Sequence, residues 1–130
     1  MRRLTVAMGL LVAGAAGVGI GLSRPSDRAS CRFDFPVGPP DGAGFYDAQP
    51  FGANHHLGND WARQGGGNTL GLFAFAAADG VVTDAQDYGG GWGNVVRVLH
   101  TCGDRVESLY AHLDRMYVTK GARVVRGQPL

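Results

Sequence analysis

Glycine is spread through this chain in a way that limits it to short segments joined by many turns. The 130 residues include 22 Gly, which separate short runs rich in Val, Leu, Phe and Tyr. These glycines follow no Gly-X-Y period, which excludes a collagen-like helix. The chain holds one Lys and one Glu, whereas long amphipathic helices need such residues on their solvent faces. We therefore expect a small all-β protein, and at this length a single domain.

The second half of the chain alternates between β-rich runs and turn signals. The runs predict strands at residues 72–76, 81–83, 94–100 and 105–112. Asp-Gly and Gly-rich turns separate them. Short strands joined by such turns predict an antiparallel sheet or sandwich. The hydrophobic share of 45% is enough for a core.

The first residues follow the plan of a secretory signal. Arg2 and Arg3 precede an uncharged run over residues 4–22, and polar residues begin at Ser23. The small residues of Gly21-Leu22-Ser23 favour cleavage after Ser23. The competing interpretation is an uncleaved membrane anchor helix, because 19 residues span about 28 Å of the ~30 Å hydrocarbon core. Either way we expect export, to the periplasm, the cell envelope or the outside.

The predicted organisation therefore has three parts. Residues 1–23 are the signal peptide or membrane anchor, and any membrane contact runs through this segment if it stays uncleaved. Residues 24–50, rich in Pro and Gly, are an irregular arm. Residues 51–130 are the β core. The formal net charge of +1 gives no reason to expect a nucleic-acid partner.

If the chain is exported, its two cysteines, Cys31 and Cys102, are expected in an oxidising compartment. In an oxidising compartment they can pair, and only one pairing exists. A zinc site would need more ligands at closer spacing, and a reactive thiol would need an activating base. We expect a disulfide that ties the arm to the β core, while the geometry of the pair stays open.

Two segments carry residues suited to catalysis. The sequence His-Leu-Gly-Asn-Asp at residues 56–60 places an imidazole, His56, and a carboxylate, Asp60, around a glycine. Both groups bind zinc, although an Asp in a loop can also serve only to hydrogen-bond the backbone. The second segment ends a predicted strand with His112, either a catalytic or a structural histidine.

Aromatic residues near these segments have two interpretations each. Tyr110 lies two residues before His112, so the two share a face of a regular strand, and Tyr110 either lines the site or lies in the core. Trp61 and Trp92 are candidate walls of a groove for a peptide or glycan, or core residues.

The order of these pieces resembles the LytM/lysostaphin-type zinc metallopeptidases, peptidase family M23. The matching motifs lie at residues 56–60, 71–82, 91–96, 100–103, 110–113 and 121–128. The resemblance covers about residues 51–130. It implies an antiparallel β core, a Zn²⁺ cofactor and cleavage of peptide cross-links in bacterial peptidoglycan. By position, His56 and Asp60 correspond to the first two zinc ligands and His112 to a catalytic histidine; His55 and His100 match no obligatory role.

The sequence departs from the family pattern at its end. The family completes its site with a downstream His-x-His element that supplies the third zinc ligand, and nothing after residue 121 matches it. We expect a C-terminally incomplete chain with weak or no activity of its own. The alternatives are a non-catalytic module that binds the cell wall or regulates a hydrolase, and a partner chain that supplies the missing histidine. A third is an exported β protein whose His and Asp are structural. The sequence predicts no oligomeric state.

Overall fold

The strands of the computed structural model, which describes residues 4–9, 32–100 and 105–130, form one antiparallel sheet. The described strands are β1 (Leu4–Gly9), β2 (Phe45–Gln49), β3 (Asn59–Arg63), β4 (Gly80–Asp87), β5 (Asn94–His100), β6 (Val106–Leu113) and β7 (Arg123–Val124). Their order across the sheet is β2-β3-β1-β6-β5-β4-β7. Apart from one 3-10 turn, η1 (Ala53–His55), these residues contain no helix. The prediction of an all-β, antiparallel fold is confirmed.

The core lies on one face of the β4-β5-β6 part of the sheet. Val96 and Val98 of β5 and Tyr110 of β6 point to this face and are fully buried. Alternation along each strand explains the arrangement, since every second side chain shares a face. The core cluster also includes residues outside the strands, namely Val37, Ala74, Ala76, Val118 and Leu130.

Extended segments rather than a second sheet cover the core. Residues 74–77 lie between residues 34–36 and residues 127–130 and exchange backbone hydrogen bonds with both. Phe75 donates to the carbonyl of Pro36 (2.9 Å), and Ala76 donates to that of Gln128 (2.8 Å). The predicted strand at 72–76 is therefore wrong in part: only Phe75 forms a bridge, with Pro129. The flanking prolines lack N–H donors, so no ladder can extend here.

The predicted irregular arm contributes a strand. Residues 45–49, at the end of the 24–50 segment, form β2 at the edge of the sheet and pair with β3, where Phe45 faces Arg63. Neither strand follows the alternating pattern that identified β5. The rest of the described arm, from residue 32 to residue 44, is irregular as predicted.

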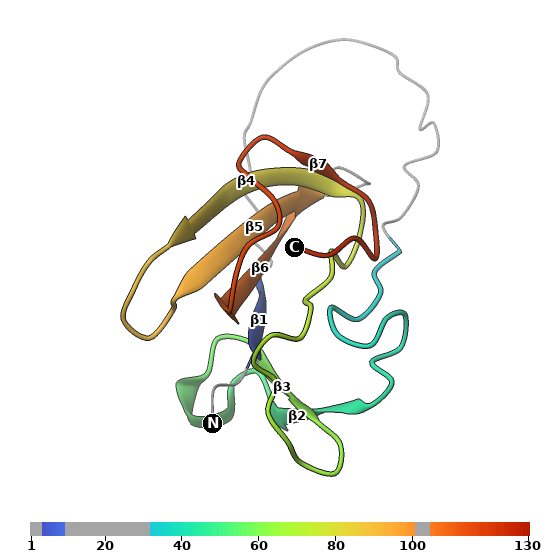
Figure 1. The fold of residues 1–130 in the computed structure, drawn as a ribbon, viewed down its shortest axis with the longest axis vertical. Helices are drawn as coiled ribbons and strands as arrows, with labels where there is room; N and C mark the ends of the chain where they lie inside the picture. The colour runs from blue at the N-terminus through green and yellow to red at the C-terminus, as the bar shows by residue number, and fades with distance from the viewer. Residues whose placement is uncertain (1–3, 10–31, 101–104) are drawn as a thin grey trace, which may run out of the picture.

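The N-terminal residues 4–9 form β1, the strand between β3 and β6 (Figure 1). The sequence predicted a signal or anchor helix over residues 1–23, and most of that segment lies outside the described residues. So do Cys31 and Cys102, whose pairing stays a prediction. Among the residues described, no helix is long and apolar enough to cross a membrane.

A series of buried hydrogen bonds joins residues 77–79 to strands β5 and β6. The Nδ1 of His100 donates to the carbonyl of Asp79 (2.9 Å), and its Nε2 lies 2.7 Å from the hydroxyl of Ser108. Ser108 is hydrogen bonded to the hydroxyl of Tyr110 (2.9 Å), which accepts the N–H of Ala77 (2.9 Å). His100 is thus a fully buried structural residue.

Candidate active site

A cavity of about 330 Å³ opens where the η1–β3 loop faces the ends of β5 and β6. Residues 54–58 form one wall, and Gly91 and Trp92 of the β4–β5 loop form another. Gln49 and His112 complete the lining. The cavity therefore gathers the loop with the predicted ligand His56 and the strand end with the predicted catalytic histidine.

His56 and Asp60 face each other beside this cavity. The Nε2 of His56 lies 3.4 Å from the Oδ1 of Asp60, and both side chains are largely buried. This separation is longer than the 2.7–3.2 Å of an N–H···O hydrogen bond. It equals the edge, about 3.4 Å, of a tetrahedron of ligands around zinc at ~2.1 Å bond lengths. The pair therefore has the spacing of two ligands that share one ion.

The backbone of His56 is held in place, while one of its ring nitrogens has no partner. Its backbone is held by two hydrogen bonds, from its own N–H to Ala53 (2.9 Å) and from Gly52 to its carbonyl (2.7 Å). Its Nδ1 is buried and has no hydrogen-bond partner, which is uncommon for a buried polar atom. The donor set fits zinc only in part, because the described residues contain no cluster of three or more His, Cys, Asp or Glu.

A β-bulge positions His112. Val96 pairs with Tyr110 and Asn94 pairs with Leu113, so the register shifts between them. His112 has a positive φ of 58°. Such a bulge re-aims a side chain, and it takes His112 out of the simple alternation that would put it beside Tyr110. His112 lines the cavity as a result.

The β4–β5 loop fixes this bulge through its backbone. The N–H of His112 donates to the carbonyl of Trp92 (2.9 Å). The side-chain amide of Asn94 donates to the carbonyls of Leu113 (3.0 Å) and Asp114 (3.1 Å). The Gly-rich loop thus holds the histidine as well as one wall of the cavity.

The environment of His112 favours its neutral form. Burial lowers the pKa of His112, the charge of Asp60 raises it, and the nearby His56 lowers it. Burial is the largest of the three effects, so the pKa lies below its ordinary value. A neutral imidazole beside a candidate metal pair can accept a proton.

The predicted aromatic residues have different positions. Trp92 lines the cavity and is 43% exposed. Trp61 instead packs edge-on against Phe35, with ring centroids 5.2 Å apart, and contacts the core. Tyr110 is fully buried, is hydrogen bonded to Ser108 and does not line the cavity. Of the two positions considered for it, Tyr110 therefore occupies the one in the core.

Backbone strain is concentrated at the cavity. Of the described non-glycine residues, those with positive φ are Asn54, His55 and His112, and all three line it. Such conformations cost free energy and gather at functional sites. The sequence analysis did not select Asn54, although Asn and His are the residue types that tolerate this region best. His55 is exposed on the cavity wall.

Comparison with known proteins gives one result. The model of a family described as Peptidase family M23 matches residues 54–130. No curated protein and no solved structure matches the chain. The matched region contains His56, Asp60 and His112, together with most of the cavity lining.

Proposed function

The chain belongs to peptidase family M23, and from this premise we propose that it is a zinc-dependent endopeptidase that cleaves peptide cross-links of bacterial peptidoglycan. The family is one of peptide hydrolases that are generally zinc-dependent. His56 and His112 line one cavity and Asp60 faces His56 beside it, and this arrangement supports the proposal for this chain. The basic start and apolar run of the N-terminal segment support export, which would bring the protein to this substrate.

Each residue has a distinct role in this proposal. His56 and Asp60 would hold the zinc ion. When bound, zinc polarises a carbonyl and lowers the pKa of water toward ~7. His112, neutral before the reaction, would take up the proton that a water loses as it adds to the peptide carbonyl, and would give it to the amide nitrogen as the C–N bond breaks. Trp92 forms a wall that positions the peptide over these groups.

We propose that the activity of this 130-residue chain is weak. Catalytic zinc sites normally have three protein ligands and an open position. The described residues supply His56 and Asp60 and no cluster of three. Two ligands hold an ion less firmly and orient its water less well.

The same observation favours a second candidate function. A chain with two ligands can act as a non-catalytic module that grips the cell wall or regulates a hydrolase. In that case binding to purified peptidoglycan would survive both a chelator and the substitution His112→Ala, and no cleavage product would appear.

Zymography on purified peptidoglycan tests the first proposal. We expect slow clearing by the full chain that requires added zinc and is lost in Asp60→Asn and in His112→Ala. Asp114→Asn, which changes an exposed carboxylate outside the cavity, is the matched control and should clear like the unmodified chain. Clearing that is equal in the presence of a chelator, or equal in Asp60→Asn, would contradict the proposal.

A further inference from the structure

A second cavity, of about 200 Å³, lies on the face of the sheet opposite the core. Its lining comes from β5 (Val95 and Arg97), from Leu109 of β6 and from the β4–β5 loop (Tyr88 and Trp92). Val95 and Arg97 alternate with Val96 and Val98 of the core, and Arg97 pairs directly with Leu109. These residues therefore share the outer face. Nothing in the catalytic proposal uses this cavity.

The two cavities share Trp92, which lines both. A molecule in the second cavity would thus contact the same indole that borders His112. The second cavity has a different character, because Tyr88 and Trp92 are both exposed aromatic residues, at 49% and 43%. Val95 and Leu109 supply aliphatic lining between them.

Arg97 is the charged residue of this cavity, and one of its donors is unused. Its Nε is buried without a hydrogen-bond partner. Its Nη1 lies 3.7 Å from a carboxylate oxygen of Glu107, beyond hydrogen-bond distance. The Arg97 side chain is 42% exposed, so a ligand oxygen in the cavity can pair with its terminal N–H groups, whereas the buried Nε is out of its reach.

The charges around this cavity nearly balance, which favours a neutral ligand over an anion. Two carboxylates, those of Glu107 and Asp84, lie near Arg97, which faces Asp84 in the strand register, and the charge of Lys120 also acts on Asp84. The hydroxyl of Tyr88 donates to Asp84, which is the main reason that the pKa of Asp84 is lowered. This bond also fixes the Tyr88 ring. The two carboxylates are matched by the two cations Arg97 and Lys120, so an added negative charge would find no net attraction here.

Neutral rings with hydroxyl groups fit these surroundings. The C–H faces of a sugar pack on aromatic rings, whose faces carry partial negative charge. Sugar hydroxyls pair with planar groups such as guanidinium and carboxylate. The volume is below the 300–1,000 Å³ typical of cavities for drug-sized ligands, which suits a single ring.

We propose that the cavity lined by Tyr88, Trp92 and Arg97 binds a neutral sugar ring of the peptidoglycan glycan strand. This inference rests on the proposed function, because the glycan carries the peptides that the adjacent site would cleave. The sugar subsite would anchor the substrate through its glycan while the peptide reaches His56, Asp60 and His112.

Titration of the full chain with the tetramer of N-acetylglucosamine, a neutral glycan, tests the inference by tryptophan fluorescence and calorimetry. We expect saturable binding that Tyr88→Ala weakens by about fivefold to tenfold, since a stacked ring is lost. Tyr88→Phe keeps the ring and should bind within about twofold of the unmodified chain. Arg97→Gln should also weaken binding.

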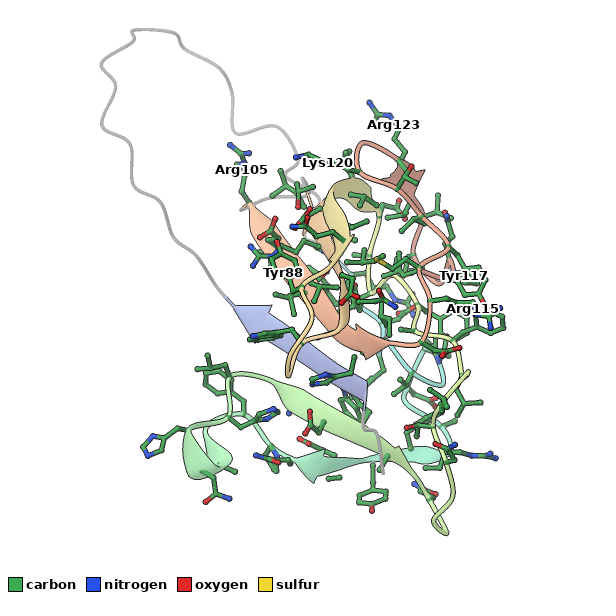
Figure 2. The ribbon with its side chains drawn as sticks, turned by 60° about the vertical axis from the view of Figure 1, so that its left-hand side comes forward. Tyr88, Arg105, Arg115, Tyr117, Lys120 and Arg123 are labelled. Atoms are coloured by element: carbon green, nitrogen blue, oxygen red, sulfur yellow. The ribbon has the colours of Figure 1, made fainter. Side chains whose placement is uncertain are left out.

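Tyr117→Ala is the matched control, because Tyr117 is exposed to a similar extent (53%) but packs on Phe73 (ring centroids 5.3 Å apart). Figure 2 shows the two tyrosines in different parts of the molecule. Equal weakening by Tyr88→Ala and Tyr117→Ala, absence of binding, or displacement of the sugar by inorganic phosphate would each overturn the inference.

Asp60→Asn separates this inference from the proposed function. That variant should bind the tetramer with unchanged affinity while peptide cleavage is lost. If the unmodified chain bound the sugar but cleaved no peptide, the subsite would stand and the peptidase proposal would be contradicted. If the unmodified chain cleaved peptide but bound no sugar, the peptidase proposal would stand and the sugar subsite would be contradicted.

Discussion

At the scale of single residues, the separation between His56 and Asp60 carries the most chemical information. Their facing atoms are 3.4 Å apart, as expected for two ligands of one ion. Asp60→Asn keeps the shape of the side chain and removes its charge, so we expect zinc affinity to fall by at least about tenfold. Competition with a chelating dye measures this, with Asp114→Asn as the control. Equal zinc affinity in both variants would remove Asp60 from the ligand set.

Tyr110 contributes at the same scale, but to stability. Its hydroxyl accepts the buried N–H of Ala77 and contacts Ser108. Tyr110→Phe leaves that N–H without a partner, so we expect the free energy of unfolding to fall by about 1–3 kcal/mol at neutral pH. Denaturant unfolding measures the loss, and Tyr117→Phe, at an exposed ring, should change it little.

The loss caused by Tyr110→Phe should also depend on pH. Burial raises the pKa of Tyr110 above the ordinary tyrosine value of 10.0. Below pH 10 the phenol is neutral in the folded and unfolded chains. Above pH ~10 the unfolded chain releases the proton first, so the unmodified protein loses stability that Tyr110→Phe cannot lose. The stability difference between the two should therefore shrink between pH 9 and pH ~11; a constant difference would contradict the assignment.

At the scale of elements, the sequence predicted strands where alternation and glycine turns coincide. It placed β5 correctly at residues 94–100, and β6 within one residue at each end. It missed β3, where Trp61 is the only residue of a type favoured in strands, and β2, which β3 pairs with. The bulge at His112 depends on register against β5, which no local pattern reveals. The residue types of the site were therefore predictable, but the exclusion of Tyr110 from it was not.

Close packing of β4 on β5 gives a prediction for that pair of strands. A Cβ at Gly80 would lie 2.6 Å from the Leu99 carbonyl oxygen and 2.6 Å from a Val98 methyl. We expect Gly80→Ala to lower the free energy of unfolding by about 1–3 kcal/mol. Gly91→Ala, where a Cβ meets nothing within 4 Å, is the control in thermal unfolding and should be nearly neutral. Equal melting temperatures would show that β4 shifts freely.

At the scale of the whole molecule, β1 joins the two halves of the candidate site. β3 carries Asp60, β6 carries His112, and the sheet order places β1 between them. Thr5 pairs with Asp60 on one side and with Ala111 on the other. The same residues belong to the predicted export signal, so cleavage after Ser23 would open a gap between β3 and β6, leaving two unpaired strand edges. Cleavage of the predicted signal would remove residues 4–9, whereas the sheet needs them as β1.

Val6→Pro distinguishes these two roles of the segment. Val6 pairs with Asn59 of β3 and with Tyr110 of β6, and proline in a central strand removes a ladder hydrogen bond, which is why it is confined to edges and bulges. If β1 joins the halves of the site, Val6→Pro should weaken zinc binding and reduce hydrogen-exchange protection in β3 more than in β4, whereas Val6→Ala should preserve both. If β3 and β6 keep their protection and zinc binding in Val6→Pro, the site forms without β1, and loss of the segment on export would cost it nothing.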